Sequence, residues 1–483
     1  MAPIDADLLF RPVTELARLV RSGELSAREL VQASLDRIEQ LNPRLNAFVD
    51  VFAEEALAEA DTIAAGDERP FAGVPIAIKN NRAVAGRRLT FAAAFLGDFI
   101  APGDDHVVAR LRRAGFVVVG TTTLPEYGIL PSTETVRFGA TRNPWDPTRT
   151  PGGSSGGSGA AVASGMVPIA HANDGGGSTR IPAACTGLVG LKPQRGRISV
   201  GPALGESFLV QDGVLTRSVA ETAAVLDLLH GYELGDSSWA APPSAPFAEQ
   251  AAAAPGRLRG ALTTAPPLAD TPVDAVCVQA THDAGALLEG LGHELVEVSD
   301  PPWTVPGMLE LFTASFGPAV CTQIAFGALL AGREPGAEDM EPLSWAIWNL
   351  SQGISSVQAQ LAAAQLQGYA RAMVAWTAQY DMVLTPALAE APVKLGVLGP
   401  ETDDPMAMFA RAGQFTPFTA ISNVTGSPAI SLPLFARPDG DPDAGLPLGV
   451  QLIGQPGGEG ALLALSAQVE AAAPWAGRRA AVS

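Results

Sequence analysis

Apolar residues in the first third of the chain recur with the spacings of helices and short strands. Near the N-terminus, Ser26 and Glu29 form a capping-box pattern ahead of an apolar repeat, which predicts a helix. The run 74–78 is apolar throughout and is typical of a buried strand. A predicted helix and a β-branched strand follow at 105–114 and 116–119. Strands that alternate with helices in this way predict an α/β fold with much parallel sheet.

The rest of the chain continues this alternation, with one loop and one long helical region. The stretch 235–256 is rich in Pro, Ala and Ser and predicts a surface excursion. Helical periodicity with large apolar side chains dominates about 300–415. The other predicted elements are a helix-then-strand pair over 272–298, paired strands at 429–434 and 448–453, and a final helix over 459–472.

Charge and composition narrow the classes of function. The 483 residues are 47% hydrophobic and carry a formal net charge of 31 − 50 = −19. Such an acidic chain repels nucleic acid and anionic membranes, so we expect neither as a partner. The sequence has no signal-peptide pattern and no run of ~18 apolar residues. We therefore expect a cytoplasmic protein without a membrane span.

Two scarce residue types add to this picture. The three cysteines lie far apart and outside any Cys/His cluster, which argues against a disulfide framework and against a zinc site. The chain has only three lysines, Lys79, Lys192 and Lys394, so arginine supplies nearly all the positive charge. A lysine within an apolar segment therefore needs an explanation.

Two stretches rich in glycine and serine carry the candidate chemistry. The first, 151–158, has the composition of a flexible linker but runs straight into a small-residue helix pattern at 160–163. The second, 173–180, follows an apolar stretch and places three consecutive glycines before Ser178. A linker would not alternate so regularly with buried elements. Backbone N–H groups of such glycines can converge on an oxyanion while the serine attacks a carbonyl group.

A serine nucleophile needs a base, and Lys79 is the strongest candidate. None of the five histidines lies in a recognisable catalytic motif, and we expect His171, the nearest to Ser178, in the core or behind the site. Lys79 ends an apolar run, where desolvation lowers the pKa of an amine from ~10.4 and favours the neutral base. A buried lysine paired with a carboxylate stays open as an alternative. Asp174 and Arg180 are interpreted as a structural pair across the turn.

A different nucleophile pattern overlaps the first glycine stretch. Residues 152–156 and 153–157 both match G-x-S-x-G, the nucleophile elbow of α/β-hydrolases. That elbow requires a strand directly before it, whereas 143–151 is a proline-rich loop. We therefore disfavour an elbow, which would also need a catalytic histidine.

These segments together resemble the amidase signature family. Residues 73–79 match its GxPxxxK pattern, 152–158 read GGSSGGS, and 176–182 match GGS-x-R-x-P. The likeness covers about residues 10–475, and three patterns in this order are highly specific.

The resemblance implies a Ser-Ser-Lys triad. Ser178 would be the nucleophile, Ser154 the bridging serine after a cis peptide bond, and Lys79 the general base. The oxyanion hole would consist of the backbone N–H groups of Gly175, Gly176, Gly177 and Ser178. The implied reaction is hydrolysis of an amide carbon–nitrogen bond through an acyl-enzyme on Ser178, with no metal and no organic cofactor. The alternative is an amidotransferase-type subunit that produces ammonia for a partner protein.

The resemblance also sets expectations for the fold. It implies an α/β amidase signature fold, with a large, mixed, mostly parallel and twisted sheet flanked by many helices. We expect a single catalytic domain over 1–483, on which N-terminal helices of 1–60 pack. A variable helical region, about 300–415, would line the substrate pocket. The expected partner is a small-molecule amide, and a homodimer stays open.

Within the family, the chain looks most like the branch that contains the 6-aminohexanoate cyclic-dimer (nylon-oligomer) hydrolase. The passages 140–145, 170–174 and 196–199 carry this impression. The expected substrate is an apolar, aryl or oligomeric amide. Carbamates (urethanes) or esters are expected side substrates because the same acyl chemistry applies. The residues assigned to the pocket, against the alternative of ordinary core packing, are Tyr127, Phe316, Cys321 and Trp345.

Overall fold

One continuous β-sheet runs through the molecule and joins its N-terminal and C-terminal parts. The computed structural model describes residues 7–203 and 207–483. In spatial order, the eleven strands of the sheet are β1 (Phe48–Val51), β3 (Val117–Thr122), β2 (Pro75–Lys79), β6 (Ile169–Asp174), β8 (Gln211–Thr216), β7 (Val189–Lys192), β12 (Ala429–Ala436), β13 (Pro447–Gly454), β11 (Met382–Pro386), β9 (Arg259–Leu262) and β10 (Glu294–Glu297). A separate pair consists of β4 (Glu134–Thr135) and β5 (Gly139–Ala140).

The expected large mixed sheet is confirmed, with a smaller parallel share than expected. Among the ten neighbouring pairs of described strands in this sheet, four are parallel and six are antiparallel. Parallel pairing joins β3, β2 and β6 on one side and β11, β9 and β10 on the other. The centre is antiparallel, because consecutive strands there return beside each other, as in the predicted pair β12 and β13.

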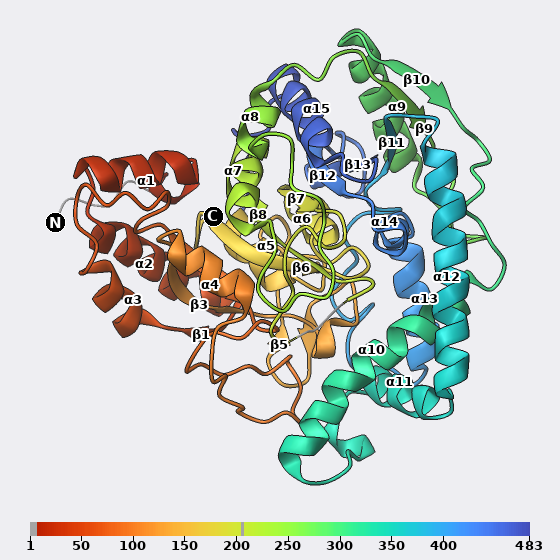
Figure 1. The fold of residues 1–483 in the computed structure, drawn as a ribbon, viewed down its shortest axis with the longest axis horizontal. Coiled ribbons are helices and arrows are strands. Elements are labelled where there is room, and N and C mark those ends of the chain that lie inside the picture. Colours follow the sequence, from red (N-terminus) through yellow and green to blue (C-terminus); the bar gives the residue numbers. More distant parts are fainter. Residues whose placement is uncertain (1–6, 204–206) are drawn as a thin grey trace.

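Helices flank this sheet, as expected for the fold class (Figure 1). The α-helices are α1 (Val13–Ser22), α2 (Ala27–Leu45), α3 (Ala53–Ala60), α4 (His106–Arg113), α5 (Gly156–Ala163), α6 (Arg180–Thr186), α7 (Val219–Leu229), α8 (Phe247–Ala252), α9 (Ala275–Gly290), α10 (Met308–Ala331), α11 (Pro342–Gln352), α12 (Ser356–Thr377), α13 (Pro405–Phe415), α14 (Ala420–Thr425) and α15 (Glu459–Ala472). Short 3-10 turns occur at Leu8–Phe10, Glu126–Gly128 and Ala337–Asp339.

The N-terminal helices lie together at one side of the molecule. In Figure 1, α1, α2 and α3 group beside β1 and β3, on the side opposite α12. The predicted capping box is present at the start of α2. The Ser26 side chain accepts the Glu29 N–H at 3.1 Å, and the Glu29 carboxylate accepts the Ser26 N–H at 2.9 Å. Reciprocal caps of this kind satisfy backbone donors that the helix leaves unpaired.

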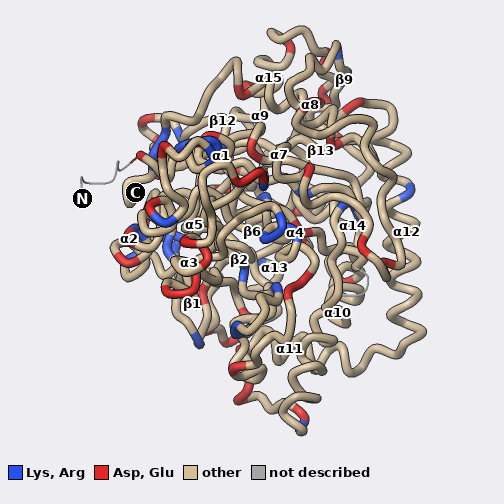
Figure 2. The backbone as a smooth tube through the Cα atoms, turned by 60° about the vertical axis from the view of Figure 1, so that its left-hand side comes forward, with Lys and Arg blue, Asp and Glu red and all other residues tan. Residues whose placement is uncertain are grey.

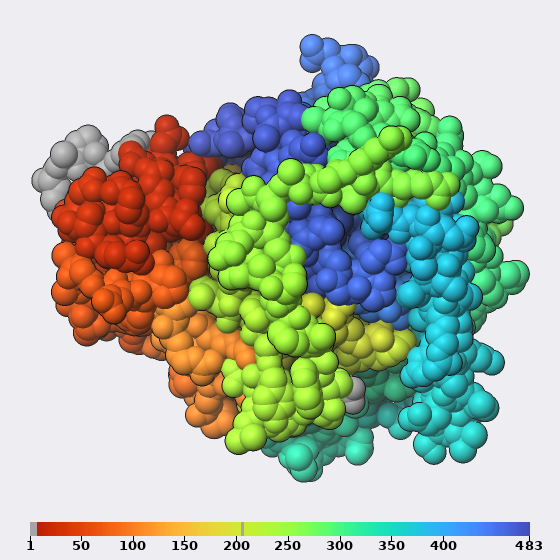
Figure 3. Space-filling model, turned by 45° about the horizontal axis from the view of Figure 1, so that its top comes forward, coloured from red at the N-terminus to blue at the C-terminus, as the bar shows by residue number. Residues whose placement is uncertain are grey.

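Two later segments agree with their predictions in the main, and each contains one further element. The loop expected over 235–256 contains a short helix, α8, whose Phe247 side chain is buried. The chain segment coloured lime-green, which includes this stretch, lies across the face shown in Figure 3. The region 300–415 is mainly helical as predicted, but it also contributes the buried strand β11. A short apolar run among long helices cannot be assigned by periodicity alone, because both settings bury it.

Helix α10 is unusually apolar for a helix on the outside of the sheet. By length and composition it is the one helix in the described part of the chain that could cross a membrane, and 22% of its most apolar window is buried. It carries a single charged residue, Glu310, and α12 carries only Arg371, so both tubes are almost uniformly tan in Figure 2. One face of α10 lines the cavity described below, which accounts for part of its apolar surface.

The parallel strands bring the candidate residues to one edge of the sheet. Lys79 is the last residue of β2, and Asp174 is the last residue of the neighbouring strand β6. Because β2 and β6 are parallel, their carboxyl ends lie at the same edge. The glycine-rich turn that leads to Ser178 starts directly after β6, so the fold itself places this turn beside Lys79.

Candidate active site

Lys79 is completely buried and makes two short polar contacts through its amine. Its Nζ lies 2.7 Å from Ser154 Oγ and 2.7 Å from Asn173 Oδ1. Burial, followed by the positive charge of Arg82, holds the pKa of the Lys79 amine well below its usual range. The Asn173 oxygen can only accept a hydrogen bond, so one N–H of the amine must point to it. The amine lone pair is then free to face the Ser154 hydroxyl.

Ser154 lies in a tightly packed turn just before α5. The Gly153–Ser154 peptide bond is cis, as the family resemblance implies. A side chain at Gly153 would meet the backbone oxygens of Ser132 and Leu130 at 2.3 and 2.6 Å, so only glycine fits this position. The residues directly before this turn form no strand, which excludes the nucleophile elbow.

Ser178 is half-buried and lines the same cavity as Ser154. The turn before it requires glycine at Gly177, which has a φ of +137°. A Cβ at that position would lie 2.3 Å from Thr419 Oγ1. The structure therefore exposes Ser178 to the cavity while the preceding glycine is locked against a neighbouring segment.

One member of the predicted oxyanion hole is not available. The N–H of Gly177 already donates to Asp174 Oδ1 at 2.8 Å, inside the turn, so it does not point to a bound carbonyl oxygen. Among the described residues, none accepts a hydrogen bond from the backbone N–H of Gly175, Gly176 or Ser178. These three N–H groups are therefore the remaining candidates.

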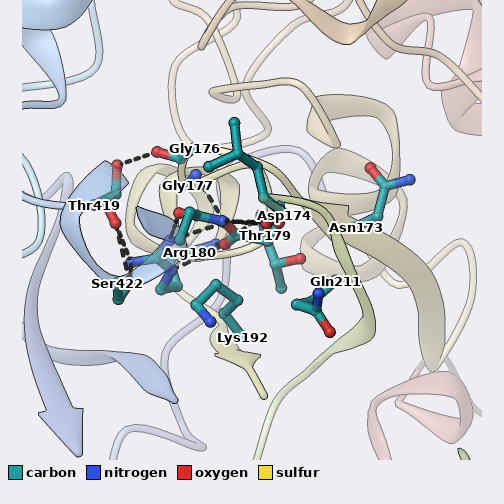
Figure 4. A network of polar contacts seen from close by, with 12 residues as sticks. Asn173, Asp174, Gly176, Gly177, Thr179, Arg180, Lys192, Gln211, Thr419 and Ser422 are labelled. Carbon is teal, nitrogen blue, oxygen red and sulfur yellow. Dashed lines mark hydrogen bonds and ion pairs between the residues drawn. The ribbon is translucent and has the colours of Figure 1, made fainter. Parts of the chain in front are cut away.

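A fully buried ion pair holds the turn from behind, as predicted (Figure 4). Arg180 Nε lies 2.9 Å from Asp174 Oδ2, and Nη2 lies 2.8 Å from Oδ1. Burial alone would raise the pKa of the Asp174 carboxyl, but the charge of Arg180 and its hydrogen bonds lower it to about 2. Arg180 also donates to the Thr419 carbonyl and to Ser422 Oγ, so the pair ties the turn to the segment around α14.

The candidate residues open onto a cavity of about 520 Å³. One part of its lining is polar and includes Ser154, Ser178, Asn81 and Asn173. The other part is apolar and includes Phe208, Leu309, Phe312, Phe316, Phe409 and Ile421. The Phe316 ring is stacked against Phe312 at a centroid distance of 5.5 Å and against Phe409 at 6.4 Å. A polar reaction centre thus adjoins an aromatic chamber.

The structure separates the four predicted pocket residues into two groups. Tyr127 and Phe316 line the cavity, whereas Cys321 and Trp345 are not among its lining residues and that part of the prediction is wrong. On α10, both neighbours of Cys321 line the cavity, whereas the omitted residues Thr313, Gly317 and Cys321 recur every four positions and so share one face of the helix. A side chain at Gly317 would meet Ser351 and Ile347, so this face lies against α11. Its Sγ is 3.9 Å from the Ile347 carbonyl.

Several residues of the site escaped the sequence prediction. Asn173 was noted only as part of a glycine-rich cluster, yet it contacts the Lys79 amine. Asn81 pairs with it, because Asn173 Nδ2 donates to Asn81 Oδ1 at 2.9 Å. The polar run that follows a buried strand was the available signal for Asn81 and Arg82. Nothing in the sequence pointed to Asp212, which lies on β8 and reaches the site only through the sheet.

The comparisons with known proteins agree with this architecture. The amidase family model matches residues 29–463, which is most of the chain. The 6-aminohexanoate-cyclic-dimer hydrolase of Paenarthrobacter ureafaciens is 37% identical over 98% of this chain and 96% of that protein. The putative amidase AmiB2 of Mycobacterium tuberculosis is 40% identical over 99% of both chains. A solved structure of 6-aminohexanoate cyclic dimer hydrolase superposes with a TM-score of 0.92 at 35% identity, over 98% of this chain and 99% of that one.

The chain belongs to the amidase family. It is a hydrolase that acts on the carbon–nitrogen bond of linear or cyclic amides. The amidotransferase alternative is represented by a more distant neighbour, the glutamyl-tRNA(Gln) amidotransferase of Thermotoga maritima. One subunit of that enzyme superposes with a TM-score of 0.78 at 29% identity, over 98% of this chain and 97% of that one.

Proposed function

We propose that this amidase uses Ser178 as nucleophile, Ser154 as proton bridge and Lys79 as general base. The observation that carries this assignment is the 2.7 Å contact between a fully buried amine, Lys79 Nζ, and Ser154 Oγ. Ser154 and Ser178 line the same cavity, so a substrate bound there meets both hydroxyl groups. A neutral lysine in this position can take a proton without any histidine.

The reaction proceeds in two steps, acylation of Ser178 and hydrolysis of the acyl-enzyme. Ser178 Oγ attacks the carbonyl carbon while its proton passes to Ser154, whose own proton passes to Lys79 Nζ. The tetrahedral intermediate collapses as the carbon–nitrogen bond breaks, and the relay returns the proton to the leaving nitrogen. Water then attacks the acyl-enzyme by the same route, which releases the acid and restores the Ser178 hydroxyl. The backbone N–H groups of Gly175, Gly176 and Ser178 hold the negative oxygen.

The substrate that fits this cavity best is an apolar, aryl or oligomeric amide. Its acyl part lies in the aromatic chamber beside Phe312 and Phe316, where a charged group would lose hydration without a partner. The relative whose name includes a cyclic dimer of 6-aminohexanoate supports an uncharged amide with a flexible carbon chain. Carbamates and esters are side substrates, because each presents a carbonyl with a leaving group.

Release of p-nitroaniline from a series of acyl p-nitroanilides tests the assignment. We expect Ser178→Ala and Lys79→Met each to lose roughly 10³-fold or more in kcat/KM. The matched control is Lys394→Met, a lysine whose side chain is 52% exposed, which should keep wild-type activity. A Ser178→Ala variant with more than about a tenth of wild-type activity would overturn the assignment of the nucleophile.

The same assay separates free hydrolysis from ammonia supply to a partner. Turnover by the purified chain, with neither a second protein nor ATP, is expected for a self-sufficient amidase. The single domain, the cytoplasmic location and the absence of a membrane partner stay predictions, as does the choice between monomer and homodimer, which the molecular mass in solution decides.

A further inference from the structure

Beside the proposed base lies a second buried ion pair that the mechanism does not use, and one of its members, Arg82, borders the cavity. Arg82 Nε lies 3.0 Å and 3.1 Å from the two oxygens of Asp212. Arg82 is 3% exposed and Asp212 is fully buried. The pair joins the turn after β2 to the start of β8, on the far side of β6. Arg82 lies directly after β2, three residues beyond Lys79.

His171 connects this pair to the base. The backbone N–H of Lys79 donates to His171 Nδ1 at 3.4 Å. Because Nδ1 accepts this bond, the ring proton must lie on Nε2, which is 3.2 Å from Asp212 Oδ1 and donates to it. Burial lowers the pKa of His171, although Asp212 opposes this, so the ring stays neutral. Arg82, Asp212, His171 and Lys79 thus form one continuous buried chain.

The charges around Lys79 explain why this chain matters. Two carboxylates, Asp174 and Asp212, act on the amine and each favours its protonated form, while Arg82 opposes protonation. Asp174 is neutralised by Arg180 and Asp212 by Arg82. Asp105 also interacts electrostatically with Arg82, but its two carboxylate oxygens accept hydrogen bonds from the backbone N–H groups of Ala83 and Ala203.

We propose that Arg82 is a positioning residue of this hydrolase, which holds Lys79 as an uncharged base by neutralising Asp212. His171 is the link that fixes the Lys79 backbone to the pair. This inference rests on the proposed role of Lys79 and adds the residue that keeps its amine unprotonated. Without Arg82, the fully buried Asp212 carboxylate would favour a proton on the basic groups around it, His171, which it contacts directly, and the Lys79 amine beyond it.

The test follows the protonation of Lys79 itself by NMR, which needs no turnover and is practical because the chain has few lysines. Lysine labelled with ¹³C at Cε gives at most three signals in this chain, and Lys394→Arg and Lys79→Arg variants identify them. In a Ser178→Ala background, we expect Arg82→Gln to raise the titration midpoint of the Lys79 signal by about one to three pH units. The double variant Arg82→Gln/Asp212→Asn should return it towards the original value. Arg257→Gln, a matched control at a side chain that is 74% exposed, should leave it unchanged.

The active enzyme gives a second readout of the same quantity. In otherwise wild-type protein, Arg82→Gln should move the acidic limb of the pH profile of kcat/KM upwards by the same amount, with activity recovered at high pH. Arg82→Lys, which keeps the charge, should leave this limb near its wild-type position. A uniform loss of activity at every pH, with an unmoved Lys79 titration, would show a purely structural role and overturn the proposal.

Two outcomes separate the failure of this inference from the failure of the proposed function. If Ser178→Ala keeps activity while Arg82→Gln still shifts the Lys79 titration, the triad assignment fails, but the proposed effect of Arg82 on the charge of Lys79 stands. If Arg82→Gln does not fold, Asp212→Asn alone is compared with the double variant. Asp212→Asn should lower the Lys79 midpoint and the double variant should restore it, and equal midpoints would overturn the proposal.

Discussion

The two parts of the substrate cavity are built on different principles. The polar part consists of backbone turns and buried charge pairs at the ends of β2 and β6, where single atoms lie within 3 Å of their partners. The apolar part centres on aromatic side chains of α10 and α13 that stack at ring distances of 5.5 to 6.4 Å. Hydrogen bonds and ion pairs depend steeply on distance and direction, whereas apolar contacts tolerate shape changes of similar volume. Reaction chemistry therefore depends on the first part and substrate choice on the second.

The largest effect on stability is expected when the buried ion pair behind the glycine turn of the polar part is removed. Asp174→Asn would leave the fully buried Arg180 guanidinium without its charge partner, which should cost about 3–5 kcal/mol of unfolding free energy. Chemical unfolding measures this loss. The control is Asp61→Asn, which removes a pair to Arg28 whose side chains are 53% and 51% exposed, and should change stability by less than about 1 kcal/mol. Equal effects of the two substitutions would contradict the special role of the buried pair.

A smaller and more selective effect is expected in the apolar part. Phe316→Ala removes the ring between Phe312 and Phe409, so kcat/KM for aryl-acyl anilides should fall by about 10- to 100-fold. Acetyl anilide, which does not reach this chamber, should be hydrolysed nearly as before. Cys321→Ala on the same helix, outside the cavity lining, serves as the control. An equal loss for both substrates in Phe316→Ala would mean that the ring supports the fold rather than substrate choice.

The smallest expected effect lies outside the cavity lining, at a buried carboxyl pair beside α11. Glu341, at the start of α11, accepts the Val136 N–H at 2.8 Å, and its own N–H donates to Glu126 at 2.9 Å. Burial first, and the neighbouring Glu126 second, raise the pKa of Glu341 to about 8. Because the folded-state pKa lies above the unfolded value, the folded protein holds the proton more tightly, and stability falls as pH rises from about 4.5 towards 8.

Glu341→Gln keeps the acceptor oxygen and removes this titration. We expect the variant to gain stability relative to wild type at pH 8.5 compared with pH 5, by at least about 1.4 kcal/mol, the equivalent of one pKa unit. Thermal unfolding at both pH values measures the difference, with the exposed Glu334→Gln as control. Parallel pH dependence of stability in wild type and Glu341→Gln would contradict a buried, neutral carboxyl at Glu341.

Local patterns in the chain were enough to predict most elements and the polar centre of the site. The capping box at Ser26, the buried strand before Lys79 and the paired C-terminal strands are such patterns, and each is present in the structure. They suffice because helix caps, strand burial and glycine turns depend on neighbouring residues. The buried Asp174–Arg180 pair was also predictable, since its members are six residues apart on one turn.

Which distant side chains meet depends on the way the elements pack. Asp212 reaches the site because β8 lies beside β6, and Thr419 closes the glycine turn from the start of α14, although neither residue belongs to a local motif. Cys321 and Phe316 share one apolar helix, and only its rotation against α11 determines that the phenyl ring faces the cavity and the thiol does not. Sequence periodicity reports how much of a helix is buried, whereas packing against other elements determines what each buried position touches.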